Sequence, residues 1–269
     1  MEKIAIYNRK GGVGKTTTSF NLAGCLDYVE HKRVLIVDCD PQSNITTSLM
    51  LYREDDYLSD SSTIYDLFMG TQKDCGKYLQ SVKFPDRKGE LTVSTRISIL
   101  PGTKDLDKIS TENMYILKDF LELYDDKFDY CIIDSPPSLT DITINILCAA
   151  DYIIIPSCAG RDSVNGYGMV IDEVNAMKTN GYNMNLQVLG VLMNKVGRRR
   201  ILEKYYSSLW SNEYDSGNSF KAQIRDSADV GNAYELGKPI HYYKRTCDVA
   251  HDYEELSKEI INRIEKKAN

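Results

Sequence analysis

Several features that mark particular classes of protein are scarce or missing in this chain of 269 residues. Only 7 residues are Pro and 17 are Gly, which excludes a fibre or a flexible linker, and 42% hydrophobic residues exclude intrinsic disorder. The 3 His and 7 Cys include no CxxC pair, so the spacing of a zinc or iron–sulfur site is missing. No apolar run approaches the roughly 18 to 20 residues of a membrane span. What remains is a globular protein of ordinary composition.

The chain is long enough to bury one large α/β core. Residues 1–4 lead directly into an apolar strand, so we expect no secretory leader. An odd number of scattered cysteines is typical of free thiols in a reducing compartment, which favours a cytoplasmic protein. No repeat or interdomain linker is visible, and we expect a single domain over residues 1–269.

The charge of the chain is uneven. In total 39 Asp and Glu oppose 33 Lys and Arg, for a net charge of −6. Residues 190–250 differ from this average, because they carry ten Lys and Arg against seven acids. We therefore expect a mildly basic face near the C-terminus of an otherwise acidic protein.

Strand and helix patterns alternate along the chain, as in a doubly wound α/β protein. Short apolar runs predict strands at 4–8, 34–38, 91–93, 97–100, 130–134, 152–156, 188–194 and 220–224. Helical spacing of apolar residues predicts helices at 15–29, 63–68, 105–125, 163–179, 199–212 and 249–267. The polar residues 39–50 have the composition of a loop. We expect a mostly parallel β-sheet with helices on both faces.

A glycine-rich motif between the first strand and the first helix is the strongest chemical signal. It has the pattern of a phosphate-binding P-loop, in which backbone N–H groups curl around an anion at a helix N-terminus. Lys15 is placed to reach the β- and γ-phosphates, and the Thr16 hydroxyl to bind Mg²⁺. The predicted nucleotide-binding residues are Lys10, Gly11, Gly12, Val13, Gly14, Lys15, Thr16 and Thr17.

Acidic residues end two of the predicted strands. Asp38 and Asp40 follow the second strand, and Asp134 ends the strand at 130–134, in a Walker B pattern. Carboxyl ends of parallel strands face the ligand crevice in open α/β sheets. Asp134 is therefore expected to hold Mg²⁺ through water. Asp38 either supports the metal or caps the turn before Pro41.

The P-loop departs from the standard pattern, because Arg9 stands where a glycine is usual and a second lysine, Lys10, follows. This arrangement resembles the deviant Walker A motif of the ParA/Soj/MinD superfamily of ATPases. The resemblance implies that Lys10 reaches the partner's phosphates across a nucleotide-sandwiched dimer, as an arginine finger does. Charge balance within one subunit is the alternative. The resemblance also implies that Asp40 is the catalytic residue that positions water, beside Lys10 and Lys15.

Later segments resemble the ParA/Soj partitioning branch in the right order along the chain. They include Ile99-Leu100-Pro101-Gly102, Gly190-Val191-Leu192-Met193-Asn194 and Gly237-Lys238-Pro239-Ile240. The resemblance implies an ATPase that uses ATP and Mg²⁺ and segregates DNA. In the cycle that the resemblance implies, Mg-ATP would drive homodimerisation, the dimer would bind double-stranded DNA without sequence preference, and a ParB-like centromere-binding partner would stimulate slow hydrolysis. Asn194 would meet the adenine, unless it is only a turn residue.

A DNA-binding surface of this kind needs Lys and Arg side chains on phosphates. The candidates lie in the basic region and are Lys195, Arg198, Arg199, Arg200, Lys204 and Arg225. A solvated helix face is the alternative interpretation. Asp226 and Asp229 depart from the ParA pattern, because basic residues are common in that segment of the branch. With the P-loop beginning at residue 10, we expect no separate N-terminal DNA-binding domain, and the ATP-bound protein to be nucleoid-associated.

Two other functions remain open at this point. A MinD-like, membrane-associated ATPase would need a terminal amphipathic helix, and the last predicted helix has a short apolar stripe formed by Leu256, Ile260, Ile261 and Ile264. Core packing of a closing helix explains that stripe equally well. A cargo-positioning ATPase that switches a protein-binding surface, without binding DNA, is the other alternative.

Overall fold

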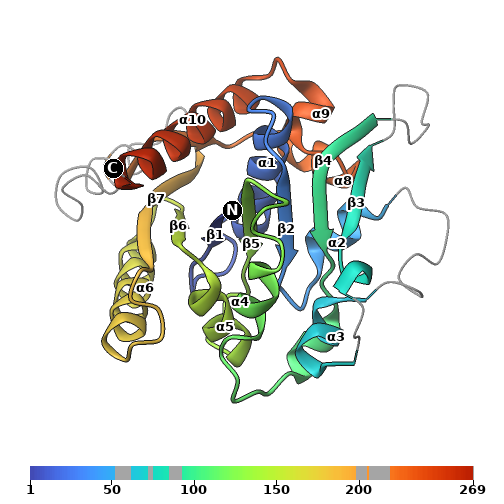
Figure 1. Ribbon diagram of the computed structural model, residues 1–269. Coiled ribbons are helices and arrows are strands. Elements are labelled where there is room, and N and C mark those ends of the chain that lie inside the picture. The colour runs from blue at the N-terminus through green and yellow to red at the C-terminus, as the bar shows by residue number, and fades with distance from the viewer. Residues whose placement is uncertain (52–61, 72–74, 85–92, 198–204, 206–218, 269) are drawn as a thin grey trace.

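A single sheet of eight strands forms the centre of the computed structural model (Figure 1). The structure describes residues 1–51, 62–71, 75–84, 93–197, 205 and 219–268. The strand order is β3-β4-β2-β5-β1-β6-β7-β8, and every neighbouring pair except β3 and β4 is parallel. The strands are β1 (Glu2–Ile6), β2 (Val34–Asp38), β3 (Gln80–Phe84), β4 (Val93–Leu100), β5 (Tyr130–Asp134), β6 (Tyr152–Ser157), β7 (Gln187–Val196) and β8 (Ser219–Arg225).

Helices cover both faces of this sheet, as the sequence predicts. In Figure 1, α1, α9 and α10 lie over one face, while α4, α5 and α6 lie over the other. The α-helices are α1 (Lys15–Tyr28), α2 (Asn44–Leu49), α3 (Ile64–Met69), α4 (Ile116–Glu122), α5 (Asp141–Ala149), α6 (Arg161–Thr179), α8 (Ala228–Glu235), α9 (Ile240–Lys244) and α10 (Asp248–Ala268). Two short 3₁₀ helices, η1 (Cys75–Lys77) and η2 (Lys104–Lys108), complete the described elements.

The hydrophobic core lies in two layers, one on each side of the sheet. Side chains alternate between the layers along the central strands, so Ile4 and Ile6 of β1 face α1 and α10, whereas Ala5 and Tyr7 face the opposite layer. The central strands are buried on both faces, which explains why their sequences are continuously apolar. Cysteines contribute to both layers as free, buried thiols: Cys25, Cys39, Cys131, Cys148 and Cys247.

The predicted helix at 105–125 is wrong. The segment forms η2 and the shorter α4, separated by residues 109–115. Side chains compete with helical hydrogen bonds there: Asp141 accepts from the Thr111 N–H at 2.9 Å, and Asn113 accepts from the Tyr115 N–H at 3.0 Å. The apolar periodicity continues through the break because Leu106, Leu117 and Leu121 pack into the same core layer.

Other predicted boundaries also change. The predicted loop 39–50 contains α2, and Val93 belongs to the long strand β4 that includes 97–100, while the edge strand is β3 at 80–84. Helices α5, α8 and α9 have no counterpart in the sequence-based assignment. The predicted helix at 199–212 lies outside the described residues, except Tyr205. Within the described part of the chain, no helix is long and apolar enough to cross a membrane.

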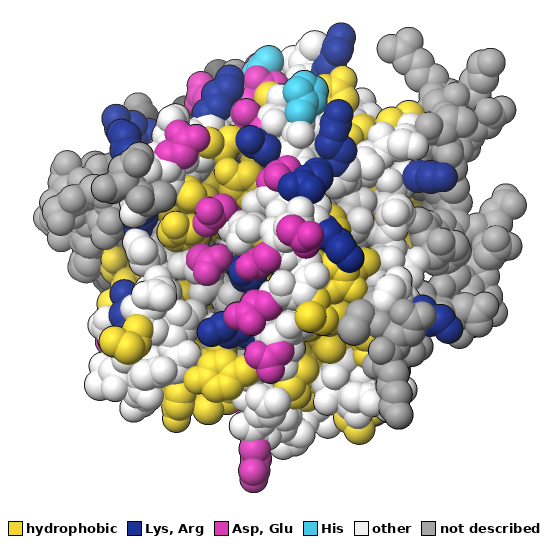
Figure 2. Space-filling view, viewed as in Figure 1, with side chains coloured by type: hydrophobic (Ala, Val, Ile, Leu, Met, Phe, Trp, Pro, Cys, Tyr) yellow, Lys and Arg dark blue, Asp and Glu magenta, His cyan; other side chains and the backbone are white. Residues whose placement is uncertain are grey.

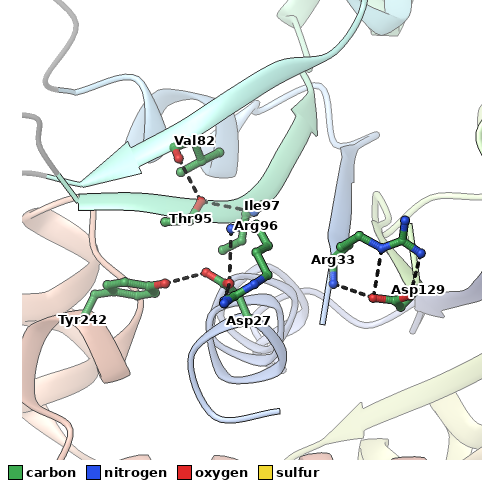
Figure 3. A network of polar contacts seen from close by, with 8 residues as sticks. All are labelled: Asp27, Arg33, Val82, Thr95, Arg96, Ile97, Asp129 and Tyr242. Atoms are coloured by element: carbon green, nitrogen blue, oxygen red, sulfur yellow. Dashed lines mark hydrogen bonds and ion pairs between the residues drawn. The ribbon is translucent and has the colours of Figure 1, made fainter. Parts of the chain in front are cut away.

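A buried carboxylate ties α1 to elements from distant parts of the chain (Figure 3). Asp27, on the last turn of α1, is fully buried. It accepts hydrogen bonds from the Tyr242 hydroxyl of α9 and from the Arg96 N–H and Nη1 of β4. A second pair in the same view, Arg33 with Asp129, is half exposed and clips the start of β2 to the segment before β5.

We expect Asp27→Ala to lower the free energy of unfolding by about 2–4 kcal/mol, because it leaves Tyr242 and the Arg96 guanidinium without their shared acceptor. The midpoint of urea denaturation, with an unchanged slope, measures this effect. Asp129→Ala serves as the matched control, since its pair is exposed to solvent and screened, and it should lose less. Equal losses in the two variants would contradict a structural role for the buried network.

Candidate phosphate-loop and nucleotide site

The loop between β1 and α1 has the geometry of an anion-binding cradle. Gly12 and Gly14 have φ angles of +75° and +90°, in the left-handed region that favours glycine. At Gly14 a Cβ would also approach the Asn194 amide nitrogen to 2.9 Å. Helix α1 begins directly after Gly14, with no side-chain cap and no acid in its first turn. Its first N–H groups therefore point into the loop, where a phosphate would be their partner.

The two lysines of the loop, Lys10 and Lys15, are both held by hydrogen bonds to the loop. Lys15 is buried, with 7% of its surface exposed, and its Nζ donates to the carbonyls of Asn8 at 3.0 Å and Lys10 at 3.2 Å. Burial lowers the pKa of Lys15, while Asp134 and Asp40 oppose that shift. Lys10 is half buried, and its N–H donates to the Asn8 side-chain oxygen at 2.9 Å. The Lys15 ammonium is thus held on carbonyl oxygens beside the cradle.

Two carboxylates end neighbouring strands in register, with Asp38 of β2 opposite Asp134 of β5. Both are fully buried. Burial raises the pKa of Asp134 to about 8, with a further contribution from the charge of Asp38, and the hydroxyls of Ser19 and Thr16 oppose the shift. Burial likewise raises the pKa of Asp38 to about 6, against hydrogen bonds from Thr46. Ionising both buried carboxylates is unfavourable, so the pair favours a bound proton or cation.

Asp38 uses its side chain to fix the segment that follows β2. Its Oδ2 accepts from the Thr46 N–H at 2.9 Å and the Thr46 hydroxyl at 2.7 Å. The same hydroxyl accepts from the Gly102 N–H at 2.8 Å, and a Cβ at Gly102 would collide with the Asp38 carbonyl at 2.7 Å. Asp38 therefore anchors α2 to the end of β4 through Thr46. The sequence suggests metal support or a turn cap before Pro41, and neither interpretation includes this contact.

Asp40 lies two residues further on, beside the cradle. It is buried, with 8% of its surface exposed, and its Oδ1 accepts from the Gln42 N–H at 2.9 Å. Its charge acts on Lys15, which places the carboxylate within electrostatic range of the phosphate-binding lysine. A carboxylate held in this position is available to orient a water molecule at the γ-phosphate.

Asp134 is the residue most suited to a metal. Its Oδ1 accepts from the Ser19 hydroxyl at 2.8 Å, but its buried Oδ2 has no hydrogen-bond partner in the described part of the protein. The nearby Thr16 hydroxyl is half buried. Among the described residues, no group of three or more His, Cys, Asp or Glu side chains could enclose a metal. The residues thus fit Mg²⁺ that is held through Thr16, water on Asp134 and nucleotide phosphates.

A small cavity of about 250 Å³ opens next to the loop, between the ends of β7 and β8. Asn194 lines it, 4% exposed, with its Nδ2 donating to the Val13 carbonyl at 3.1 Å and the Thr18 hydroxyl at 3.0 Å. The Asn194 Oδ1 is buried without a partner among the described residues. An exocyclic amino group of a nucleobase would satisfy that oxygen. The cavity lining is Gly14, Thr17, Asn194, Lys195, Ile224, Arg225, Asp226, Ser227, Val230, Gly231 and Tyr253.

The structure gives internal partners to two residues predicted for a DNA surface. Lys195 has a positive φ of 54° and its Nζ donates to the Gly12 carbonyl at 3.0 Å, so it closes over the phosphate loop. Arg225 forms ion pairs with Asp252 and Asp248, both at 2.6 Å. The other four candidates, Arg198, Arg199, Arg200 and Lys204, lie outside the described residues.

Sequence reasoning missed several residues that complete the site. Asn8 binds both lysines of the loop, Ser19 donates to Asp134, and Tyr253 of α10 lines the cavity next to the loop. Asn8 and Ser19 sit close to the motif in the sequence and could have been singled out by that proximity. Tyr253 has no local signal, because its contact spans more than 200 residues of sequence.

The pKa of Asp134 makes a prediction about the nucleotide-free, metal-free protein. Between the ordinary value of 3.8 and the folded value of about 8, the folded protein binds more protons than the unfolded chain. Its free energy of unfolding should therefore fall as pH rises from about 4 to about 8, by at most ~1.4 kcal/mol per pH unit. Asp134→Asn does not titrate, so its stability relative to wild type should grow with pH across this window.

Urea denaturation at intervals of one pH unit measures that difference, with exposed Asp107→Asn as the control variant, for which the difference should stay flat. Saturating Mg-ATP should reduce the pH dependence, because the cation compensates the buried charge. If the difference in free energy of unfolding between wild type and Asp134→Asn does not change with pH, Asp134 is ionised in the folded protein throughout this window.

Comparison with known proteins agrees with this geometry. Residues 1–188 match the family model described as an AAA domain. The chain is 31% identical to the sporulation initiation inhibitor protein Soj of Bacillus subtilis, over 96% of this chain and 97% of that protein. It is 30% identical to the chromosome-partitioning ATPase Soj of Thermus thermophilus, over 99% and 98% of the two chains.

Among solved structures, an ATP complex of McdA from Cyanothece superposes with a TM-score of 0.79, covering 98% of this chain and 96% of that chain at 23% identity. At that identity the likeness concerns the fold. The predicted fold class is confirmed. The chain belongs to the ParA/Soj/MinD superfamily of P-loop ATPases and is itself an ATPase.

Proposed function

We propose that this protein is an ATP-dependent DNA-partitioning switch. Mg-ATP drives formation of a sandwich homodimer that binds double-stranded DNA without sequence preference, and slow hydrolysis, stimulated by a ParB-like centromere-bound partner, separates the subunits. The observation that carries the proposal is the match, over nearly the full length of both chains, to partitioning ATPases of the Soj type. The single domain over residues 1–269 would then contain all parts of the switch, and the ATP-bound form would be associated with the nucleoid.

The geometry of the phosphate loop supports the nucleotide half of this cycle. Lys15 would leave its two carbonyl partners for the β- and γ-phosphates, Thr16 and Asp134 would hold Mg²⁺, and Asn194 would bind the base. Asp40 would orient the attacking water. Lys10 would act on the phosphates of the partner subunit, and its half-buried place at the edge of the loop is compatible with that role.

The DNA half of the cycle needs a run of cations. On the face viewed in Figure 2, acidic side chains gather at the centre, and Lys and Arg side chains surround them, with several close together above and to the right of the centre. Since Lys195 and Arg225 have internal partners, the proposed contacts to DNA phosphates fall on Arg198, Arg199, Arg200 and Lys204. Dimerisation would double this small patch and so raise the affinity for a polyanion.

The membrane alternative loses its main support in the structure. Leu256, Ile260 and Ile264 of α10 are at most 5% exposed and pack into the core layer that α10 shares with α1. Ile261 is partly buried and packs against the same layer, so these four residues do not form an exposed membrane-binding stripe. A cargo-positioning switch that binds a protein instead of DNA uses the same ATP cycle, and it is the function that a failure to bind DNA would favour.

Binding to random duplex DNA tests the proposal. We expect binding with Mg-ATP only, and a loss of affinity of at least about tenfold between ~50 and ~200 mM salt. Fluorescence anisotropy with Mg-ATP, Mg-ADP and no nucleotide measures both effects. Substituting Arg198, Arg199 and Arg200 by Gln should abolish binding while the ATP dimer persists. Absence of binding at low salt, with the ATP dimer verified by sedimentation, would overturn the DNA function.

Three variants test the roles of the loop. Lys15→Ala should abolish ATP binding, because the phosphate charge loses its main cation. Asp40→Ala should lower kcat by about 100-fold or more while the ATP-bound dimer accumulates, since water is no longer oriented. Lys10→Ala should prevent both dimerisation and turnover.

Exposed Lys104→Ala and Asp107→Asn, both on η2, serve as controls. Phosphate release and sedimentation velocity are the two measurements. Normal turnover in Asp40→Ala would refute its catalytic assignment, and unchanged dimerisation and turnover in Lys10→Ala would refute action across the dimer.

A further inference from the structure

Residues 7–9, which lead from β1 into the phosphate loop, are held from one side by β6 and α6. The Tyr7 N–H donates to the Ile154 carbonyl at 3.0 Å, and the Asn8 Nδ2 donates to the Pro156 carbonyl at 2.8 Å. Helix α6 adds a close approach, since a Cβ at Gly166 would lie 3.0 Å from the Asn8 side-chain oxygen. The position of this short segment therefore depends on elements that lie about 150 residues further along the chain.

Glu173 of α6 makes the central contact. Its Oε2 accepts from the Tyr7 hydroxyl at 2.6 Å, and its Oε1 accepts from the Arg9 guanidinium at 2.5 Å. The side chains of Glu173 and Arg9 are 14% and 33% exposed, while Tyr7 is fully buried. Burial and the Glu173 carboxylate raise the pKa of Tyr7, so its hydroxyl remains a donor. One carboxylate thus holds the residues on both sides of Asn8.

This clamp acts on the two lysines of the loop through the backbone. Asn8 and Lys10 supply the carbonyls on which the Lys15 ammonium rests, and the Asn8 side chain fixes the Lys10 N–H. A displacement of residues 7–9 would therefore move Lys10 directly and loosen the carbonyl partners of Lys15. Shifts of about 1 Å in groups that bind a transition state are enough to reduce turnover strongly.

We propose that Glu173 is a positioning residue for ATP turnover, which clamps Tyr7 and Arg9 so that the main chain presents Lys10 correctly at the phosphates. The inference rests on the proposed role of Lys10 in turnover, and it is independent of DNA binding. The proposal also explains Arg9, because its guanidinium pairs with Glu173 of α6 and so anchors the residue next to Lys10.

Glu173→Gln tests this proposal. Gln still offers an oxygen that accepts from the Tyr7 hydroxyl, but it is neutral, so the ion pair with the Arg9 guanidinium is lost. We expect kcat for ATP hydrolysis to fall about tenfold, the scale of one lost charge-assisted hydrogen bond, while Kd for ADP changes less than about twofold. Phosphate release and titration with a fluorescent ADP analogue are the measurements. Asp172→Asn, a neighbour on α6, is the matched control and should behave as wild type.

A double-mutant cycle distinguishes positioning from simple stabilisation. Arg9→Gln should lower kcat as Glu173→Gln does, the double variant should be no worse than either, and Arg9→Lys should restore most of the turnover by keeping the ion pair. The thermal midpoint of all variants should stay close to wild type. Losses of kcat that simply multiply in the double variant, or that follow a loss of folded protein, would overturn the proposal.

Lys10→Ala, measured in the same assay, distinguishes a failure of the positioning role of Glu173 from a failure of the proposed ATP cycle. Turnover lost in Lys10→Ala but normal in Glu173→Gln would overturn the role of Glu173 and leave the proposed cycle intact. Normal turnover in Lys10→Ala would overturn the proposed cycle at that step, and the positioning role with it.

Discussion

Two buried carboxylates, Asp38 and Asp134, lie in register on neighbouring strands. The need to compensate their charges is the constraint on which the edge of the sheet beside the phosphate loop depends. Removing two like charges from water raises both pKa values, and the surrounding residues offset that cost in different ways. Asp38 is satisfied by Thr46 and becomes a structural anchor. Asp134 keeps one oxygen without a partner among the described residues, and Lys15 adds a positive charge nearby. As a result Asp134 has an oxygen suited to a cation, whereas Asp38 is committed to the fold.

The phosphate loop is preorganised by a ring of contacts from both sides. From β7, Asn194 and Lys195 donate to the carbonyls of Val13 and Gly12, so they hold the glycine-rich turn. From α6, Glu173 fixes the entry to the loop. The cradle is therefore present before an anion arrives, and binding energy is not consumed in building it. Elements that lie more than 150 residues from the glycine-rich motif in the sequence supply these contacts.

Within the described part of the chain, some basic side chains are committed to internal ion pairs. Arg225 illustrates the effect: it is counted in the basic region of the sequence, yet it lies between Asp248 and Asp252 and presents little net charge to a polyanion. Lys244 is similarly paired with Asp229. A local excess of basic residues therefore overstates the basic surface, because a formal count ignores pairing with acids from other elements.

The sequence by itself determined the fold class, the glycine-rich loop with Lys10 and Lys15, and the strand-end positions of Asp38 and Asp134. These depend on local spacing and on period-two or helical patterns, which are properties of short segments. It did not reveal the break between η2 and α4, because Asp141 competes for the helix N–H groups from a distant position. Nor did it reveal Glu173, Tyr253 or the neutralisation of Arg225. Only the tertiary structure decided these, because each is a contact between elements far apart in the chain, and no local pattern encodes which side chains such packing brings together.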